Sequence, residues 1–358
     1  MNRTICFLLL GLFLSSSNIK AQTSPDIGGE ISRTQSWDLD KSKNIWTRTR
    51  FILKFDHQAS DDVHAYANLK MYTTEESRFD WKLSEAYIDS YNILDKFDLR
   101  TGVQIFSWGT AYSINPTDNL NPFDISGQEA FIPEDRLGVS ALRFKYYPIT
   151  DLTLTCVLIP YFVPALQPAG TELPERIMGN SEYAFKAAAQ SLWGWDISAS
   201  YFKGKEDYPW INGQYRDVEI YGGDVIGTLW EIALWAEGTY TKPKVGDSSY
   251  QLAAGGEYTF GSDLYSMGQF YHRNREDDSK ENYLMAVLRY PFRDIHTLQL
   301  GMAYEIENKI LIVFPEVTLS LADAVSLVLS GVVVKGDVAG TIMSQMKDRI
   351  FLKCEYSF

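Results

Sequence analysis

Hydrophobic and polar residues alternate along most of this chain with a period of two, the pattern of β-strands that present one face to an apolar medium. In residues 45–56, Phe51, Leu53 and Phe55 share one phase, while arginine, lysine and aspartate share the other. The same alternation returns in 62–72 and 294–305. At about ten to twelve residues, these segments fit tilted strands crossing a bilayer better than the shorter strands of globular sheets.

The connectors between the segments alternate in length, which is typical of outer-membrane barrels with tight periplasmic turns and extended outer loops. Short turns are predicted near 58–61, 92–95, 148–150, 191–192, 226–227, 261–262, 291–293 and 322–323. Longer connectors are predicted at 73–80, 107–136, 160–180, 203–214, 241–248, 274–280 and 337–347. Two outer connectors, near 40–44 and 306–308, are short.

We therefore predict an all-β fold, a transmembrane antiparallel up-and-down β-barrel of about 18 strands, with 16 as the alternative if one hairpin is miscounted. Closure is required because an open sheet edge in hydrocarbon leaves backbone N–H and C=O groups unpaired. The expected strands are 27–39, 45–57, 62–72, 81–91, 96–106, 137–147, 151–159, 181–190, 193–202, 215–225, 228–240, 249–260, 263–273, 281–290, 294–305, 309–321, 324–336 and 348–358.

One long connector, 107–136, interrupts this regular arrangement. Connectors of about thirty residues are usually functional or disordered. Its aromatic residues disfavour disorder and its prolines stiffen the backbone, so we predict an ordered loop that folds inward and constricts the barrel. An exposed loop that covers the barrel mouth is the alternative. The residues expected to shape the constriction are Trp108, Tyr112, Asn115, Pro116, Thr117, Asp118, Asn121, Pro122, Asp124 and Glu129.

Residues 1–21 have the features of a signal peptide. Arg3 supplies a positive start, residues 5–14 are apolar, and Ala21 offers a small residue for cleavage. Ten apolar residues are half of what a membrane-spanning helix needs. We predict an exported chain in which residues 22–358 form the barrel.

The last segment alternates apolar and polar residues and ends on Phe358. It resembles the C-terminal assembly signature of bacterial outer-membrane barrels, a terminal aromatic residue preceded by alternating apolar residues. The expected partners are accordingly the barrel-assembly machinery and the lipid bilayer.

Charged residues on the predicted inner phase are unevenly distributed. Early strands place basic residues inside, whereas later strands place acidic ones, so that a basic wall would face an acidic one and orient polar solutes. Charges that merely keep the interior hydrated are the alternative. The basic set is Arg48, Arg50, Lys54, Lys70, Arg100, Arg143 and Lys145, and the acidic set is Asp217, Glu219, Glu231, Glu237, Glu257, Glu305 and Glu316.

Composition excludes several function classes. Without residues 1–21 the chain has 31 basic residues against 46 acidic ones, a net charge near −15, which argues against nucleic acid as a partner. Hydrolase, zinc-protease and P-loop motifs are missing, and the four histidines lack metal-ligand spacing. We predict no enzyme activity, no cofactor and no metal site. Cys156 and Cys354 are expected to be small lipid-facing or buried residues rather than a disulfide framework.

Three motifs carry a resemblance to a known family. They are G-x-Q-x-x-x-W-G at 102–109, N-P-T-D-x-x-x-P-x-D at 115–124 and I-P-x-x-x-P at 159–164. In these the chain resembles porin-like outer-membrane proteins grouped only as a domain of unknown function. The resemblance covers about a third of the chain and implies a barrel without catalysis, although this chain is shorter than those proteins.

The sequence thus favours a passive diffusion channel for small solutes in the outer membrane of a Gram-negative bacterium, with loop 107–136 as its constriction. The alternative is a non-conducting barrel that acts as a surface binding or structural protein. The sequence leaves open the solute, the ion selectivity, the pore size and the choice between monomer and homotrimer.

Overall fold

The structure, a computed structural model, describes residues 24–39, 43–73, 79–112, 114–125, 136–167, 173–210, 213–276, 279–338 and 347–358. Over these residues it contains eighteen β-strands and one short 3-10 helix, Met178–Asn180. The strands are β1 (Asp26–Asp38), β2 (Lys43–Ser60), β3 (Val63–Thr73), β4 (Phe79–Ile93), β5 (Phe97–Gln104), β6 (Val139–Ile149), β7 (Leu152–Ile159), β8 (Glu182–Leu192), β9 (Trp195–Lys205), β10 (Asp217–Leu229), β11 (Ile232–Pro243), β12 (Ser249–Thr259), β13 (Tyr265–Asn274), β14 (Lys280–Phe292), β15 (His296–Glu305), β16 (Ile310–Ala322), β17 (Val325–Lys335) and β18 (Arg349–Ser357).

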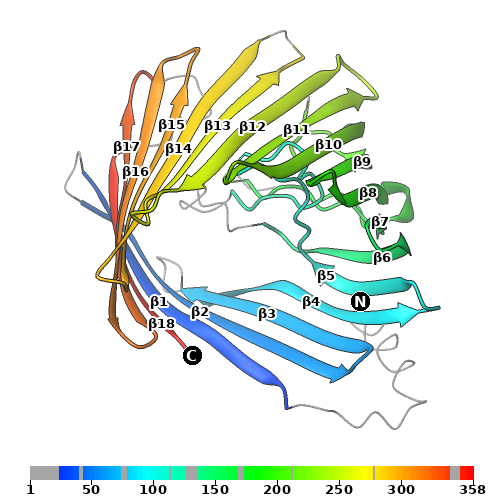
Figure 1. Ribbon diagram of the computed structural model, residues 1–358, viewed down its shortest axis with the longest axis horizontal. Coiled ribbons are helices and arrows are strands. Elements are labelled where there is room, and N and C mark those ends of the chain that lie inside the picture. The colour runs from blue at the N-terminus through cyan, green and yellow to red at the C-terminus, as the bar shows by residue number, and fades with distance from the viewer. Residues whose placement is uncertain are drawn as a thin grey trace.

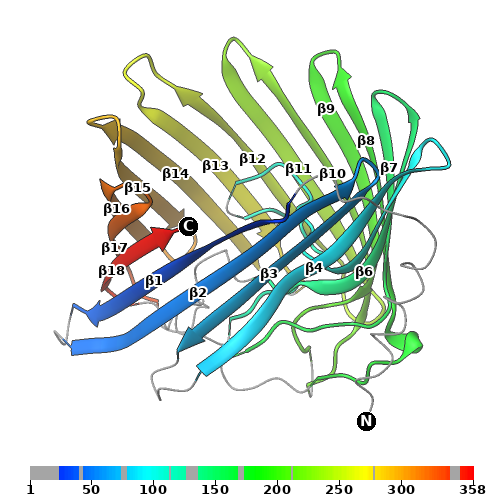
Figure 2. The same ribbon diagram turned by 90° about the horizontal axis from the view of Figure 1, so that it is seen from below.

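The strands form one closed ring. Each pairs antiparallel with its sequence neighbours, and β1 also pairs with β18, so the sheet has no free edge (Figure 1). Figure 2 shows the strands inclined in the same sense around the wall, as closure of a barrel requires. The predicted all-β barrel of eighteen strands is confirmed, and the sixteen-stranded alternative is wrong. No helix in the described ranges is both long and apolar enough to cross a membrane.

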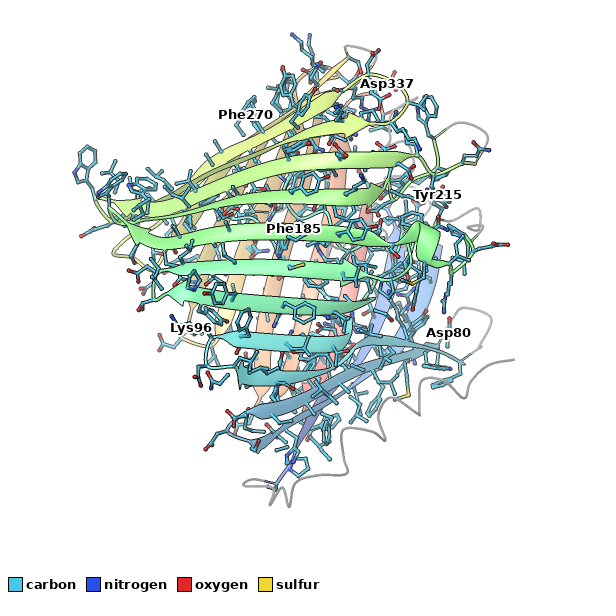
Figure 3. All side chains as sticks on the ribbon, turned by 90° about the vertical axis from the view of Figure 1, so that its right-hand side faces the viewer. Asp80, Lys96, Phe185, Tyr215, Phe270 and Asp337 are labelled. Carbon is cyan, nitrogen blue, oxygen red and sulfur yellow. The ribbon has the colours of Figure 1, made fainter. Side chains whose placement is uncertain are left out.

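Short connectors gather at one end of the barrel and longer ones at the other, as Figure 3 shows with Lys96 at the first end and Asp80, Tyr215 and Asp337 at the second. We call these the turn end and the loop end. Several turns have two consecutive residues with positive φ, including Trp230 (51°) and Glu231 (79°). This is the geometry of two-residue hairpin turns that match the twist of the flanking strands.

Cross-strand register fixes which residues face inward, because residues directly opposite each other share one side of a sheet. Loop residues inside the barrel contact Glu237 on β11 and Gln269 on β13, which marks their phase as the inner one. Glu237 lies opposite Asp224 of β10, so Asp224 also faces inward. The pairing of each strand with the next identifies the inward-facing residues of the other strands in the same way. On the opposite phase, Phe185 and Phe270 are 50% and 41% exposed on the outer surface (Figure 3).

The end of the chain completes the closure. Backbone N–H groups of Gly29 and Phe358 each donate to the other residue's carbonyl, at 2.8 and 3.0 Å. The Phe358 ring lies over Gly29, where a Cβ would come within 2.7 Å of it, and stacks on Phe51 at a centroid distance of 5.9 Å. The terminal aromatic therefore packs on both strands that follow it around the ring, and a side chain at position 29 would displace it.

The connector between β5 and β6 lies inside the ring of strands (Figure 1). Its described residues, 105–112, 114–125 and 136–138, contact β11 and β13 by hydrogen bonds. Since β5 and β13 are eight strands apart in a ring of eighteen, this segment crosses the interior. We call it the inner loop.

Candidate functional site

One carboxylate on the far wall holds the inner loop. Glu237 accepts hydrogen bonds from the backbone N–H groups of Thr110 (2.6 Å), Ala111 (3.0 Å) and Thr117 (3.3 Å). The side chain is 4% exposed. Backbone N–H groups that converge on one carboxylate satisfy donors that would otherwise be buried without partners. Glu237 therefore fixes both ends of the turn between residues 110 and 117.

Gln269 on β13 anchors the tip of the same loop. Its side-chain oxygen accepts from the N–H of Tyr112 at 2.7 Å, and its amide nitrogen donates to the carbonyls of Tyr112 (2.7 Å) and Ile114 (3.1 Å). Trp235 also donates to this oxygen, at 3.1 Å, and so orients the amide. The loop is thus bonded through its backbone to two strands of the far wall.

An apolar cluster fastens the base of the loop. Phe106, Trp108 and Leu120 are 3%, 7% and 3% exposed. They pack against inward-facing residues of β6 to β10, namely Val139, Ala141, Val157, Ile159, Ala184, Phe202 and Val218, with Val163 and Ile220 at the edge. The inner wall is therefore apolar where the loop rests on it.

The loop is also braced from within. Asn121 is 1% exposed, and its side chain accepts from the N–H of Phe106 (2.6 Å) and donates to the carbonyls of Gln104 (3.1 Å) and Leu137 (2.8 Å). Asn115 donates to the carbonyl of Trp108 at 2.9 Å. Pro116 and Pro122 are buried beside these asparagines. These bonds give the N-P-T-D motif a physical role, since they hold the turn in one shape.

Gly109 of the W-G pair is required by space and by backbone conformation. Its φ is +86°, and a Cβ there would lie 2.2 Å from Thr117 Oγ1 and 2.4 Å from a Glu237 carboxylate oxygen. A side chain would both strain the backbone and separate the loop from Glu237. The motif glycine and the anchoring carboxylate therefore form one unit.

Two ion pairs connect loop acids to basic residues. Asp118 pairs with Arg136 at 2.6 Å and Asp124 pairs with Lys82 of β4 at 3.2 Å. Burial raises the pKa of the Asp118 carboxyl, while Arg136 opposes that rise. Each of these two predicted constriction residues therefore lies against a cation. Glu129, Glu134 and Asp135, the other acids of the loop, lie outside the described residues.

The predicted basic residues of β2, β3, β5 and β6 all occupy the inner phase. This follows from the register for Arg48, Arg50, Lys54, Lys70, Arg100 and Arg143.

Acids are interleaved with these cations. Arg100 donates two hydrogen bonds of 2.7 Å to Asp89, which also lies 3.5 Å from Arg143, and Arg50 pairs with Glu30 at 3.0 Å. The wall is charged and internally paired rather than uniformly basic.

The acidic side of the prediction needs correction. Glu231 does not line the wall, since it lies exposed in the turn after β10. Asp217 and Glu219 lie on the outer phase of β10, opposite Lys205 and Lys203. The error came from assigning the apolar phase of 215–225 to lipid, whereas Val218 and Ile220 face inward under the loop. Glu257 does lie on the inner phase and accepts from the Tyr265 hydroxyl at 2.6 Å.

Several residues of the site were not singled out from the sequence. Gln269 and Lys82 carry contacts in the structure, and Glu237 was expected only as one wall acid among seven. The polar phase of β13 could have selected Gln269, because it occupies a polar position in that strand. No local sequence pattern indicates that Glu237 and Gln269 bind loop residues 120 to 157 positions away in the chain.

No family model matches the chain, and no curated protein matches it. Solved structures share the fold. OpdK of Pseudomonas aeruginosa is 9% identical with a TM-score of 0.61, covering 93% of this chain and 99% of that one. OccK5 (OpdH) of the same organism is 10% identical with a TM-score of 0.60 over 94% and 98%. Salmonella typhi OmpF, solved with daunomycin, is 12% identical with a TM-score of 0.52 over 93% and 97%. These likenesses show that the chain shares the porin-like β-barrel fold of these structures.

Proposed function

We propose that this barrel is an outer-membrane channel for passive diffusion of small polar solutes, and that loop 107–136 is its constriction. The observation that carries the proposal is the anchoring of the inner loop across the lumen on Glu237 and Gln269. A segment that narrows a pore must keep its shape, and this one is bonded through its backbone at both anchors. A loop that only covered the mouth would not need buried partners on the far wall.

Charge on the remaining wall supports a hydrated path. The inner phase of β2 to β6 carries Arg48, Lys54 and Lys70 among other cations. Across the ring, Glu257, Glu305 and Glu316 lie on the inner phases of β12, β15 and β16. Opposed charges in a low-dielectric wall produce a transverse field that orients dipolar solutes. We therefore expect polar or zwitterionic solutes to pass more readily than apolar ones.

Export through the predicted signal peptide and assembly by the barrel-assembly machinery complete the proposal, with the lipid bilayer as the surrounding medium. The porin-like fold shared with outer-membrane barrels of Pseudomonas aeruginosa and Salmonella typhi supports this location. We propose no catalytic role and no cofactor.

Conductance of the reconstituted chain in planar bilayers tests the channel, and swelling of proteoliposomes in sugars of increasing size measures its width. We expect discrete conductance steps and a sharp size cutoff. Conductance indistinguishable from that of the protein-free bilayer would instead favour the alternative, a non-conducting barrel that acts as a surface binding or structural protein.

A further inference from the structure

Lysines gather on the outer surface of the barrel at the loop end of β9, β10 and β11. Glu219 of β10 lies directly opposite Lys203 of β9 on one side and Lys242 of β11 on the other. Lys203 and Glu219 are 3.5 Å apart, with side chains 54% and 33% exposed. Residues opposite one another share a face, so this row points away from the lumen, as Tyr221 next to it does.

A second row lies beyond the first, nearer the loop end. Asp217 lies opposite Lys205, which it contacts at 2.7 Å, and Lys244 approaches it from the other side at 3.3 Å. The Lys244 side chain is 75% exposed. The two rows together contain four lysines and two carboxylates. We call them the outer lysine patch, defined by Lys203, Lys205, Lys242 and Lys244.

Aromatic side chains form the next row toward the middle of the barrel. The register places Phe185, Tyr201, Tyr221, Tyr240 and Tyr250 side by side on β8 to β12. Tyr201 and Tyr221 lie 5.2 Å apart between ring centroids, and Tyr221 donates to Glu219 at 3.2 Å. A belt of this kind marks the level of lipid headgroups in membrane barrels. The patch therefore lies at headgroup level or just above it.

We propose that the outer lysine patch binds the phosphate groups of an anionic lipid headgroup in the surrounding leaflet. The inference rests on the proposed membrane location. The patch has a net charge of +2 on a chain whose formal net charge is −13, so its sign is opposite to the general trend. Lysines beside an aromatic belt extend their ammonium groups to the headgroup layer while their stems cover apolar surface.

A lipid is favoured over a soluble anion because the aromatic row supplies a surface for acyl chains directly below the charges. Neighbouring strands do not repeat the arrangement. Tyr183 of β8 lies opposite Lys203, and Tyr250 of β12 continues the row beyond Tyr240. The lysines lie on β9 and β11, with Tyr183 of β8 beside Lys203 and the aromatic row below them, which fits one headgroup rather than a continuous basic band.

Binding of a diphosphorylated lipid, lipid A, to the detergent-solubilised full barrel tests the proposal, with bound lipid counted by native mass spectrometry. The double variant Lys203→Gln with Lys242→Gln should lower the affinity for the tightest-bound lipid A about thirty-fold. This follows because each lysine near an anionic surface contributes about 1 kcal/mol to binding. Lys203→Arg with Lys242→Arg should retain it, and inorganic phosphate should not displace it.

Lys280→Gln with Lys335→Gln is the matched control, because both residues lie exposed on the outer phase at the loop end of other strands. This pair should leave lipid A affinity unchanged. Equal affinity of the Lys203/Lys242 glutamine variant and the unaltered chain would overturn the proposal, as would displacement by inorganic phosphate. Bilayer conductance of the same variant separates the two proposals, since a lost lipid site with normal conductance leaves the channel intact.

Discussion

Replacement of Glu237 by alanine should release the inner loop from the far wall. The carboxylate accepts from three backbone N–H groups, on Thr110, Ala111 and Thr117, and is almost fully buried. Alanine removes the acceptor and leaves these donors without a partner in a confined space. Gln269 still holds the tip of the loop, so we expect greater mobility rather than complete loss of structure.

The magnitude follows from the number and charge of the bonds. A hydrogen bond to a charged group contributes about 1.5–3 kcal/mol. Three of them sum to about 4.5–9 kcal/mol, but desolvation of the carboxylate offsets several kcal/mol of that sum. Each buried donor left without a partner costs about 1–3 kcal/mol, so three of them should lower the equilibrium constant for loop docking by at least about a hundredfold. Glu237→Gln retains an acceptor oxygen and should have a smaller effect.

Single-channel recording measures the consequence as mean conductance and as noise in the open state. We expect Glu237→Ala to raise both, because a mobile loop obstructs less and fluctuates more. Glu257→Ala is the matched control, since it removes an inner-phase carboxylate whose observed bond is to Tyr265 rather than to the loop. Glu237→Ala traces indistinguishable from those of Glu257→Ala would refute the reasoning.

Three further outcomes are expected. Deletion of residues 112–129 should leave a folded barrel that conducts more, and loss of heat-modifiable gel mobility in that variant would show instead that the loop is part of the fold. Phe358→Ala should reduce membrane assembly more than any single lumen substitution, because its ring packs over the β1 backbone, and normal surface levels would contradict this. Joint replacement of Arg48, Arg50 and Arg100 by glutamine should shift reversal potentials toward cation selectivity, since positive charge is removed from a narrow lumen. That shift should shrink at molar salt, where the screening length is about 3 Å, and an unchanged potential at low salt would place these arginines off the conducting path.

The strands were predictable because their signal is local. A period-two pattern records that successive side chains meet different surroundings, and hairpin turns require residues that tolerate positive φ or tight bends. Every predicted strand overlaps an observed one. The boundary that moved most, between β10 and β11, shifted because the turn forms at Trp230 and Glu231 rather than at the predicted 226–227.

The side of each strand that faces the lumen was less predictable. An apolar side chain indicates apolar surroundings, but these can lie on either side of the barrel wall. On β2 the apolar residues face away from the lumen, so Phe51 faces out and Arg50 faces in. On β10 the inner loop is the apolar partner, so Val218 faces in and Glu219 faces out. The same rule applied to both strands therefore gave the wrong face for the second.

The sequence by itself determined the strand segments, the antiparallel order, the position of the long loop and the residues that stiffen it, since these depend on neighbours a few positions away. Only the tertiary structure decided that Glu237 and Gln269 hold the loop and that Asp118 and Asp124 lie against cations. Those contacts join residues far apart in the chain, and they exist because closure of eighteen strands brings β11 and β13 across the lumen from β5. No local sequence pattern indicates that these strands lie across the lumen from one another.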